Sequence, residues 1–168
     1  MNETAGSIAA KAIGVRCLLG AWFALSALGL VGCQTPAPLA PLNLAEPGWQ
    51  VRQGQAVWRA RPQRPALAGE FLVAWHSDGR GFAQFTKTPF TLLNARLSPT
   101  QWQIEFPSER RSYHGGGVPS PQFAWLHLPH ALANVPLPPP LEMVQKGDGG
   151  WLLVNRHTGE QIDGYLSP

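Results

Sequence analysis

The length, composition and charge of the chain exclude one broad class of protein. The 168 residues carry a formal charge of +3, contain two cysteines and seven tryptophans, and show neither an internal repeat nor a long run of charge. A dense basic stripe, which is typical of nucleic-acid-binding proteins, is absent from the sequence, so we expect no nucleic acid partner.

The first feature along the chain is an apolar stretch, residues 17–32, preceded by the cationic residues Lys11 and Arg16. This order is typical of a secretory signal. The stretch closes on Leu30-Val31-Gly32-Cys33, which resembles the lipobox of bacterial lipoproteins. An ordinary signal peptide and a single membrane span are the alternatives, but the stretch is short for a span, which needs ~20 residues. The resemblance implies that residues 1–32 are removed and that a lipid is attached to Cys33.

This resemblance also predicts where the protein resides. Cys17 leaves with the leader, so no cysteine pair remains for a disulfide. In bacteria with two membranes, an Asp after the lipidated cysteine favours the inner membrane, whereas this chain has Gln34. We therefore expect a lipid-anchored protein of the outer membrane that faces the periplasm. Acyl chains such as palmitate anchor proteins stably when two or more are present.

A proline-rich segment, residues 34–47, follows the anchor. Such a chain extends by ~3.1 Å per residue, so the segment could span ~43 Å. We expect residues 33–47 to form a lipidated tether and residues 48–168 to form one domain. Removing Lys11, Arg16 and Glu3 from the 13 Lys/Arg and 10 Asp/Glu leaves 11 and 9 in the mature chain, a charge of +2. A domain of this size buries about two thirds of its unfolded surface.

The domain is predicted to be mainly β, with short strands joined by tight turns. Asp78-Gly79 is a strong hairpin signal, and Ser98-Pro99-Thr100 is a second turn. Apolar residues alternate with polar ones in residues 101–106, as in a half-buried strand. The predicted strands are 51–60, 70–76, 81–87, 90–97, 101–106, 110–114, 141–145, 151–155 and 161–166.

One helix is predicted to interrupt the strands. Ser120 is a good N-cap, and Pro121 suits the first helical position. Pro129 should end or kink the helix, and residues 131–135 could add another turn. Most of this segment is apolar, so we expect it to be buried against the sheet.

The central hairpin has an unusual pattern. A two-residue turn at Asp78-Gly79 would place Trp75 opposite Phe82, so that Phe71, Val73, Trp75 and Phe82 share one face. The other face would then also be apolar, whereas a sheet covered on one side alternates apolar and polar residues. Two explanations stay open, a packed two-layer core and a curved sheet around an apolar cavity.

The order of these features resembles LolB and the related LolA-like proteins of the bacterial envelope. The local matches are Trp49, Lys87-Thr88-Pro89-Phe90, Tyr113, Trp125-Leu126-His127-Leu128-Pro129 and Gly149-Gly150-Trp151. The resemblance implies a strongly curved antiparallel meander sheet, an open half-barrel, with one or two short helices covering an apolar cavity. It implies binding of lipid or of lipoprotein acyl chains, and a part in lipoprotein localisation. This domain is shorter than those of the family.

Residue by residue, the resemblance predicts a cavity and a delivery loop. Phe90 matches the place of the apolar residue that helps LolB to deliver its cargo to the membrane, although an aromatic residue after a proline is more often part of a core. The residues expected to bind lipid are Phe71, Val73, Trp75, Phe82, Trp102, Trp125 and Leu153.

The sequence gives no argument for an enzyme, a metal or a cofactor. His127 and His130 are three residues apart, but Pro129 lies between them and no third ligand accompanies them. His76-Ser77-Asp78 contains triad residue types, yet adjacent residues in a turn do not face each other as a triad must. Gly115-Gly116-Gly117 lacks the residues of a phosphate-binding loop. Arg110-Arg111, together with Arg96, could meet lipid phosphates, but an ordinary solvated face is the better explanation of these residues.

Two functions therefore remain. The first is a lipid or acyl-chain carrier. The second is a non-enzymatic structural or assembly lipoprotein that binds another envelope protein through its sheet edge or an aromatic surface. We expect a monomer in either case.

Overall fold

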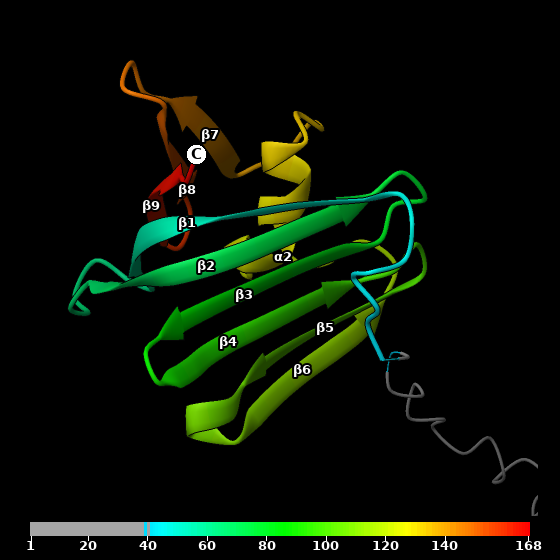
Figure 1. The fold of residues 1–168 in the computed structure, drawn as a ribbon. Helices are drawn as coiled ribbons and strands as arrows, with labels where there is room; N and C mark the ends of the chain where they lie inside the picture. Colours follow the sequence, from blue (N-terminus) through cyan, green and yellow to red (C-terminus); the bar gives the residue numbers. More distant parts are fainter. Residues whose placement is uncertain (1–38, 40) are drawn as a thin grey trace, which may run out of the picture. The chain divides into compact units, whose positions relative to one another are not determined.

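The computed structural model describes residue 39 and residues 41–168, which belong to one compact unit, Pro36–Pro168. The predicted leader and Cys33 lie outside the described residues. The described chain forms nine strands, one short 3-10 helix and one α-helix (Figure 1). Their bounds are β1 Trp49–Arg59, β2 Leu67–His76, β3 Gly81–Lys87, β4 Phe90–Leu97, β5 Gln101–Phe106, η2 Pro107–Glu109, β6 Arg111–Gly116, α2 Ala124–Leu132, β7 Leu141–Gln145, β8 Gly150–Asn155 and β9 Gln161–Leu166.

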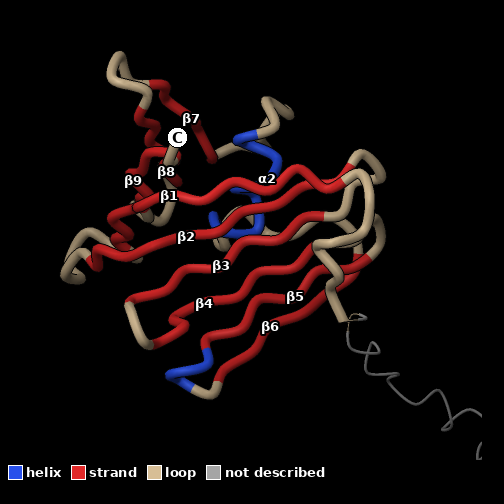
Figure 2. The backbone as a smooth tube through the Cα atoms, viewed as in Figure 1, coloured by secondary structure: helices blue, strands red, loops and turns tan. Residues whose placement is uncertain are grey.

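All nine strands form one antiparallel sheet in the order β6-β5-β4-β3-β2-β1-β9-β8-β7. Strands β1 to β6 make a meander, and the last strand returns to pair with β1. The sheet stays open, with β6 and β7 as its edges, and α2 covers one of its faces (Figure 2). The prediction of a mainly β, open and curved meander with a short covering helix is confirmed.

The core lies between the sheet and α2. On β2, β3 and β4 the residues of the inner face are buried, and successive pairs such as Phe71–Phe85 and Phe85–Leu93 continue across the strands. Helix α2 contributes Trp125, Leu126 and Leu128, each at most 1% exposed. Because side chains alternate along a strand, the other set of residues forms an outer face.

The register of the central hairpin differs from the prediction. The connection is a three-residue loop, residues 77–79, in which Gly79 has a φ of 90° and donates its N–H to the His76 carbonyl. Trp75 therefore pairs with Gly81, and Ala74 pairs with Phe82. A shift of one residue moves every side chain of a strand to the opposite face. Phe82 thus lies on the outer face, and its predicted place beside Trp75 is wrong.

This correction also changes the character of the two faces. The outer face carries Gln84, Thr86, Asn94 and Arg96 beside Phe82, so it is far more polar than predicted. The apparent double apolar face of the hairpin came from the wrong register. One of the two grounds for expecting a cavity is therefore removed.

The helix begins later and continues further than predicted. It starts at Ala124, after a turn in which Phe123 donates its N–H to the Ser120 carbonyl. Pro129 lies inside the helix and is fully buried, where it lies against Gly81. A side chain at Gly81 would meet the proline ring at 3.1 Å, so this close packing stabilises a proline that an isolated helix would not tolerate.

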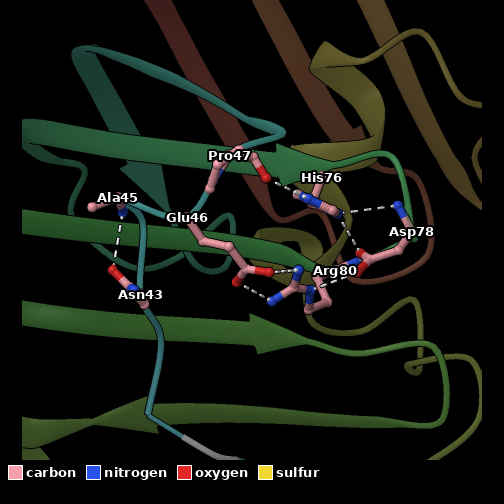
Figure 3. A network of polar contacts seen from close by, with 7 residues as sticks. All are labelled: Asn43, Ala45, Glu46, Pro47, His76, Asp78 and Arg80. Carbon is pink, nitrogen blue, oxygen red and sulfur yellow. Dashed lines mark hydrogen bonds and ion pairs between the residues drawn. The ribbon is translucent and has the colours of Figure 1, made fainter.

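The end of the predicted tether packs on the domain (Figure 3). The Glu46 carboxylate accepts two hydrogen bonds from the Arg80 guanidinium, at 2.9 and 3.0 Å, and Arg80 also donates to Asp78 at 2.7 Å. The Pro47 carbonyl lies 3.1 Å from His76 Nε2. Glu46 and Pro47, which were predicted to belong to the tether, thus contact the domain. These contacts join residues far apart in the chain, so they leave no local pattern in the sequence.

Candidate functional site

The inner face of the sheet brings together most of the residues predicted to bind lipid. Phe71, Val73, Trp125 and Leu153 are at most 3% exposed and belong to the packed core. The Trp125 ring lies 5.0 Å from that of Phe85. These side chains pack against one another and fill the space under α2, so in this structure they form part of a closed core.

The other predicted residues have different surroundings. Trp75 and Trp102 are half-buried on the inner face and pack against the core. Phe90 is the first residue of β4, directly after the β3–β4 turn, and is 67% exposed. An aromatic ring this exposed takes no part in the core. A place in the core was the alternative explanation of an aromatic residue at this position.

An aromatic band lies on the inner face beside α2, over β5 and β6. We use this name for Trp102, Phe106, Tyr113 and Phe123. Neighbouring ring centroids are 5.6 Å apart for Trp102 and Phe123, 5.3 Å for Tyr113 and Phe123, and 6.2 Å for Phe106 and Tyr113. None of the four is fully buried, because α2 packs chiefly on β2, β3, β4 and β8. Tyr113 is 39% exposed and the other three rings are partly buried, so α2 leaves this apolar part of the inner face partly open.

Three members of the band were not predicted as site residues. The alternation of Trp102, Ile104 and Phe106 places Phe106 on the same face as Trp102 and could have revealed it. Tyr113 pairs with Ile104 across β5 and β6, and so shares that face. Phe123 lies before the helix, where no sequence period fixes the direction of a side chain.

The start of α2 is held by two polar side chains near the β8–β9 turn. Glu160 accepts hydrogen bonds from Trp58 Nε1 at 2.8 Å and from the Ala124 N–H at 3.2 Å. Asn155 donates to the Pro121 carbonyl at 2.7 Å. Burial raises the pKa of Glu160 to about 7, although both donors oppose the shift. These contacts join β1, the β8–β9 turn and the helix, and no local sequence pattern predicts them.

The two histidines of α2 are at least partly buried. Burial lowers the pKa of His127 and of His130, which favours the neutral rings. His127 Nε2 is buried without a hydrogen-bond partner. Within the described part of the chain, no group of three or more His, Cys, Asp or Glu residues is arranged to hold a metal ion.

A cleft of about 460 Å³ lies elsewhere, between β1, the start of β2, β9 and the β7–β8 turn. Two of its polar pairs are Lys146 with Asp163, at 2.5 Å, and the Tyr165 hydroxyl with Gln55, at 2.8 Å. None of the seven residues predicted to bind lipid lines this cleft. It is therefore a different place from the predicted cavity.

No protein-family model matches this chain, and no curated protein matches its sequence. Among the residues that the structure describes, no helix is both long and apolar enough to cross a membrane.

Proposed function

We propose that this protein is a lipid-anchored envelope protein that holds an acyl chain on the inner face of its sheet, between α2 and strands β5 and β6. The observation that carries the proposal is the aromatic band, a row of half-covered rings beside the only helix that covers this face in the described chain. Exposed apolar surface of this kind, next to polar surroundings, is typical of ligand-binding sites.

The rings of the band supply an apolar surface that suits an acyl chain. Trp102, Phe106 and Phe123 are partly buried, and Tyr113 is 39% exposed. An acyl chain lying across the rings would cover their exposed parts, and apolar area removed from water stabilises the complex.

The exposed turn at Phe90 fits the delivery step that the LolB-like resemblance implies. An aromatic ring that is 67% exposed at the tip of a hairpin can enter the interface of a bilayer. In this proposal the anchor at Cys33 keeps the domain at the outer membrane, and Phe90 brings the acyl chain of a lipoprotein to that membrane.

The proposal is tested with a fluorescent fatty acyl probe and the chain Gln34–Pro168, which contains the whole compact unit. Saturable binding with a change in tryptophan emission is expected. Phe123→Ala should weaken the binding, because it removes a ring that contacts both Trp102 and Tyr113. Phe82→Ala is the matched control, since the same change on the outer face should leave binding unaltered.

Two results would contradict the proposal. The first is a folded domain, shown by circular dichroism, that binds no probe. The second is equal loss of binding in the Phe82 and Phe123 variants, since binding would then not depend on the inner face.

The second function, binding of another envelope protein, is favoured by one observation. Strand β6 is an edge of the sheet, and five of its six residues are exposed. An exposed edge offers unpaired backbone groups to a strand of a partner. A proline at Ser112, on this edge, should abolish capture of such a partner and leave acyl binding intact.

A further inference from the structure

Four connections of the sheet lie at one end of its strands. The registers place the β1–β2, β3–β4, β5–β6 and β8–β9 turns at this end, because Trp58 pairs with Leu67, Glu70 with Thr86, and Gln161 with Arg59. Figure 1 shows the first three of these turns on the same side of the sheet. The segment that ends at Glu46 approaches from the opposite end, at the β2–β3 turn.

Most of the cations of the domain lie at this end, which we name the basic end. They are scattered in the sequence, and only the fold brings them to one end. They make up seven of the eleven Lys/Arg of the mature chain, namely Arg59, Arg61, Arg64, Lys87, Arg110, Arg111 and Arg156.

Few carboxylates neutralise the basic end. Arg111 pairs with Glu109, and Arg156 pairs with Glu142. Glu160 is at the same end but is buried under the helix start. The other five cations are exposed, and none of them forms an ion pair within the described chain. At the opposite end Arg80 is balanced by Glu46 and Asp78.

We propose that the basic end binds an anionic lipid surface. The cations lie on separate turns and form a broad array at the end of a sheet, which suits many headgroup phosphates at once. Each Lys or Arg near an anionic bilayer contributes about 1 kcal/mol. The exposed ring of Phe90 lies among them, and an apolar side chain at the centre of a basic surface favours a membrane over a nucleic acid or an acidic protein.

This contact does not depend on the lipid anchor, on the acyl site or on the aromatic band. The basic end and the aromatic band share no residue, and they meet where the Arg111 guanidinium lies 5.9 Å from the centre of the Phe106 ring. A failure of acyl binding would therefore leave this proposal standing, and the reverse also holds.

The experiment measures co-sedimentation of the chain Gln34–Pro168, without acyl groups, with vesicles. Binding is expected to vesicles of phosphatidylcholine with phosphatidylglycerol and not to vesicles of phosphatidylcholine alone. It should weaken as salt is added, because salt screens exposed charges. Arg61→Gln should weaken it about fivefold, and Arg61→Gln with Arg64→Gln about thirtyfold, from about 1 kcal/mol per charge.

Arg52→Gln is the matched control. It removes the same charge from an exposed position on β1 outside the basic end, so vesicle binding should stay close to that of the unchanged chain. Equal weakening by Arg52→Gln and Arg61→Gln would overturn the proposal, because binding would follow net charge alone. Equal binding to both kinds of vesicle, or tighter binding to a duplex oligonucleotide than to anionic vesicles, would also overturn it.

Discussion

Glu160 offers the sharpest test of how the helix is held on the sheet. Its carboxylate is 6% exposed and accepts hydrogen bonds from Trp58 and from the first residue of α2. Burial raises its pKa from 4.5 to about 7. This rise in the pKa corresponds to about 3 kcal/mol of difference between the protonated and the charged carboxyl group in the folded state.

The sign of the effect follows from the direction of the shift. The folded state holds the proton of Glu160 more tightly than the unfolded state, so this group favours folding fully below about pH 4.5. That contribution is lost as the pH rises through about 7. Glutamine has no proton to lose, so its contribution does not change with pH. Its amide nitrogen cannot accept a hydrogen bond, so one of the two donors, Trp58 Nε1 or the Ala124 N–H, loses its acceptor at a cost of about 1–3 kcal/mol at every pH. We therefore expect Glu160→Gln to be less stable than the wild type near pH 4.5, and the difference to move in the variant's favour by about 3 kcal/mol between pH 4.5 and pH 8.

Urea unfolding of both chains between pH 4.5 and pH 8 measures this difference directly. His127 and His130 have lowered pKa values, so their contribution is gained as the pH rises towards 6.5. Both histidines are present in both chains, so their contribution cancels in the comparison. Parallel stability curves, or a difference that moves in the wild type's favour as the pH rises, would refute the account of a carboxylate buried at the start of the helix.

The remaining predictions concern the anchor, the N-terminal segment and two phenylalanines. Cys33→Ser should leave an uncleaved precursor without acyl label; labelling of this variant by a fatty acid probe would contradict the lipobox interpretation. A chain that starts at Gly48 should have a lower thermal midpoint than one that starts at Gln34, because it lacks the Glu46–Arg80 pair, whereas a chain that starts at Asn43 should match the longer one. Gly48→Ala should cost at least about 1 kcal/mol in chemical unfolding, because Gly48 has a φ of 99° and a Cβ there would lie 2.4 Å from His76. Phe85→Ala should cost about 3–5 kcal/mol in the same assay, whereas Phe90→Ala should stay within about 0.5 kcal/mol; similar costs for both would show that Phe90 packs in a core.

The strands were predictable because their signals are local. The bounds of β3, β4, β5, β7 and β9 match the prediction, since alternating side chains and turn residues mark both ends of each strand. The register of one hairpin was not predictable in the same way. Asp78-Gly79 correctly indicates a turn. The same dipeptide occurs in two-residue and in three-residue loops, and these two loops place Phe82 on opposite faces of the sheet.

The features that were missed depend on contacts between residues far apart in the chain. Glu46 and Arg80 are 34 residues apart, and Trp58 and Glu160 are 102 apart. Nothing in the residues around Glu46 distinguishes it from a solvated charge in a flexible segment. Likewise, the cations of the basic end become neighbours only when the meander folds. They form no basic stripe in the sequence, so they were not predicted as a group.

The segment docked before β1 also limits how far the basic end can lie from the anchor at Cys33 in the lipoprotein proposed above. Residues 34–45, twelve in number, separate Cys33 from Glu46, and a proline-rich chain of that length extends about 37 Å at most. The basic end lies at the far end of β1, whose 11 residues span roughly 36 Å. A tether that barely reaches a second site gives a low effective concentration there, and a longer tether raises it. Release of the Glu46–Arg80 pair would lengthen the tether, so in the proposed lipoprotein this surface pair would restrict membrane contact by the basic end.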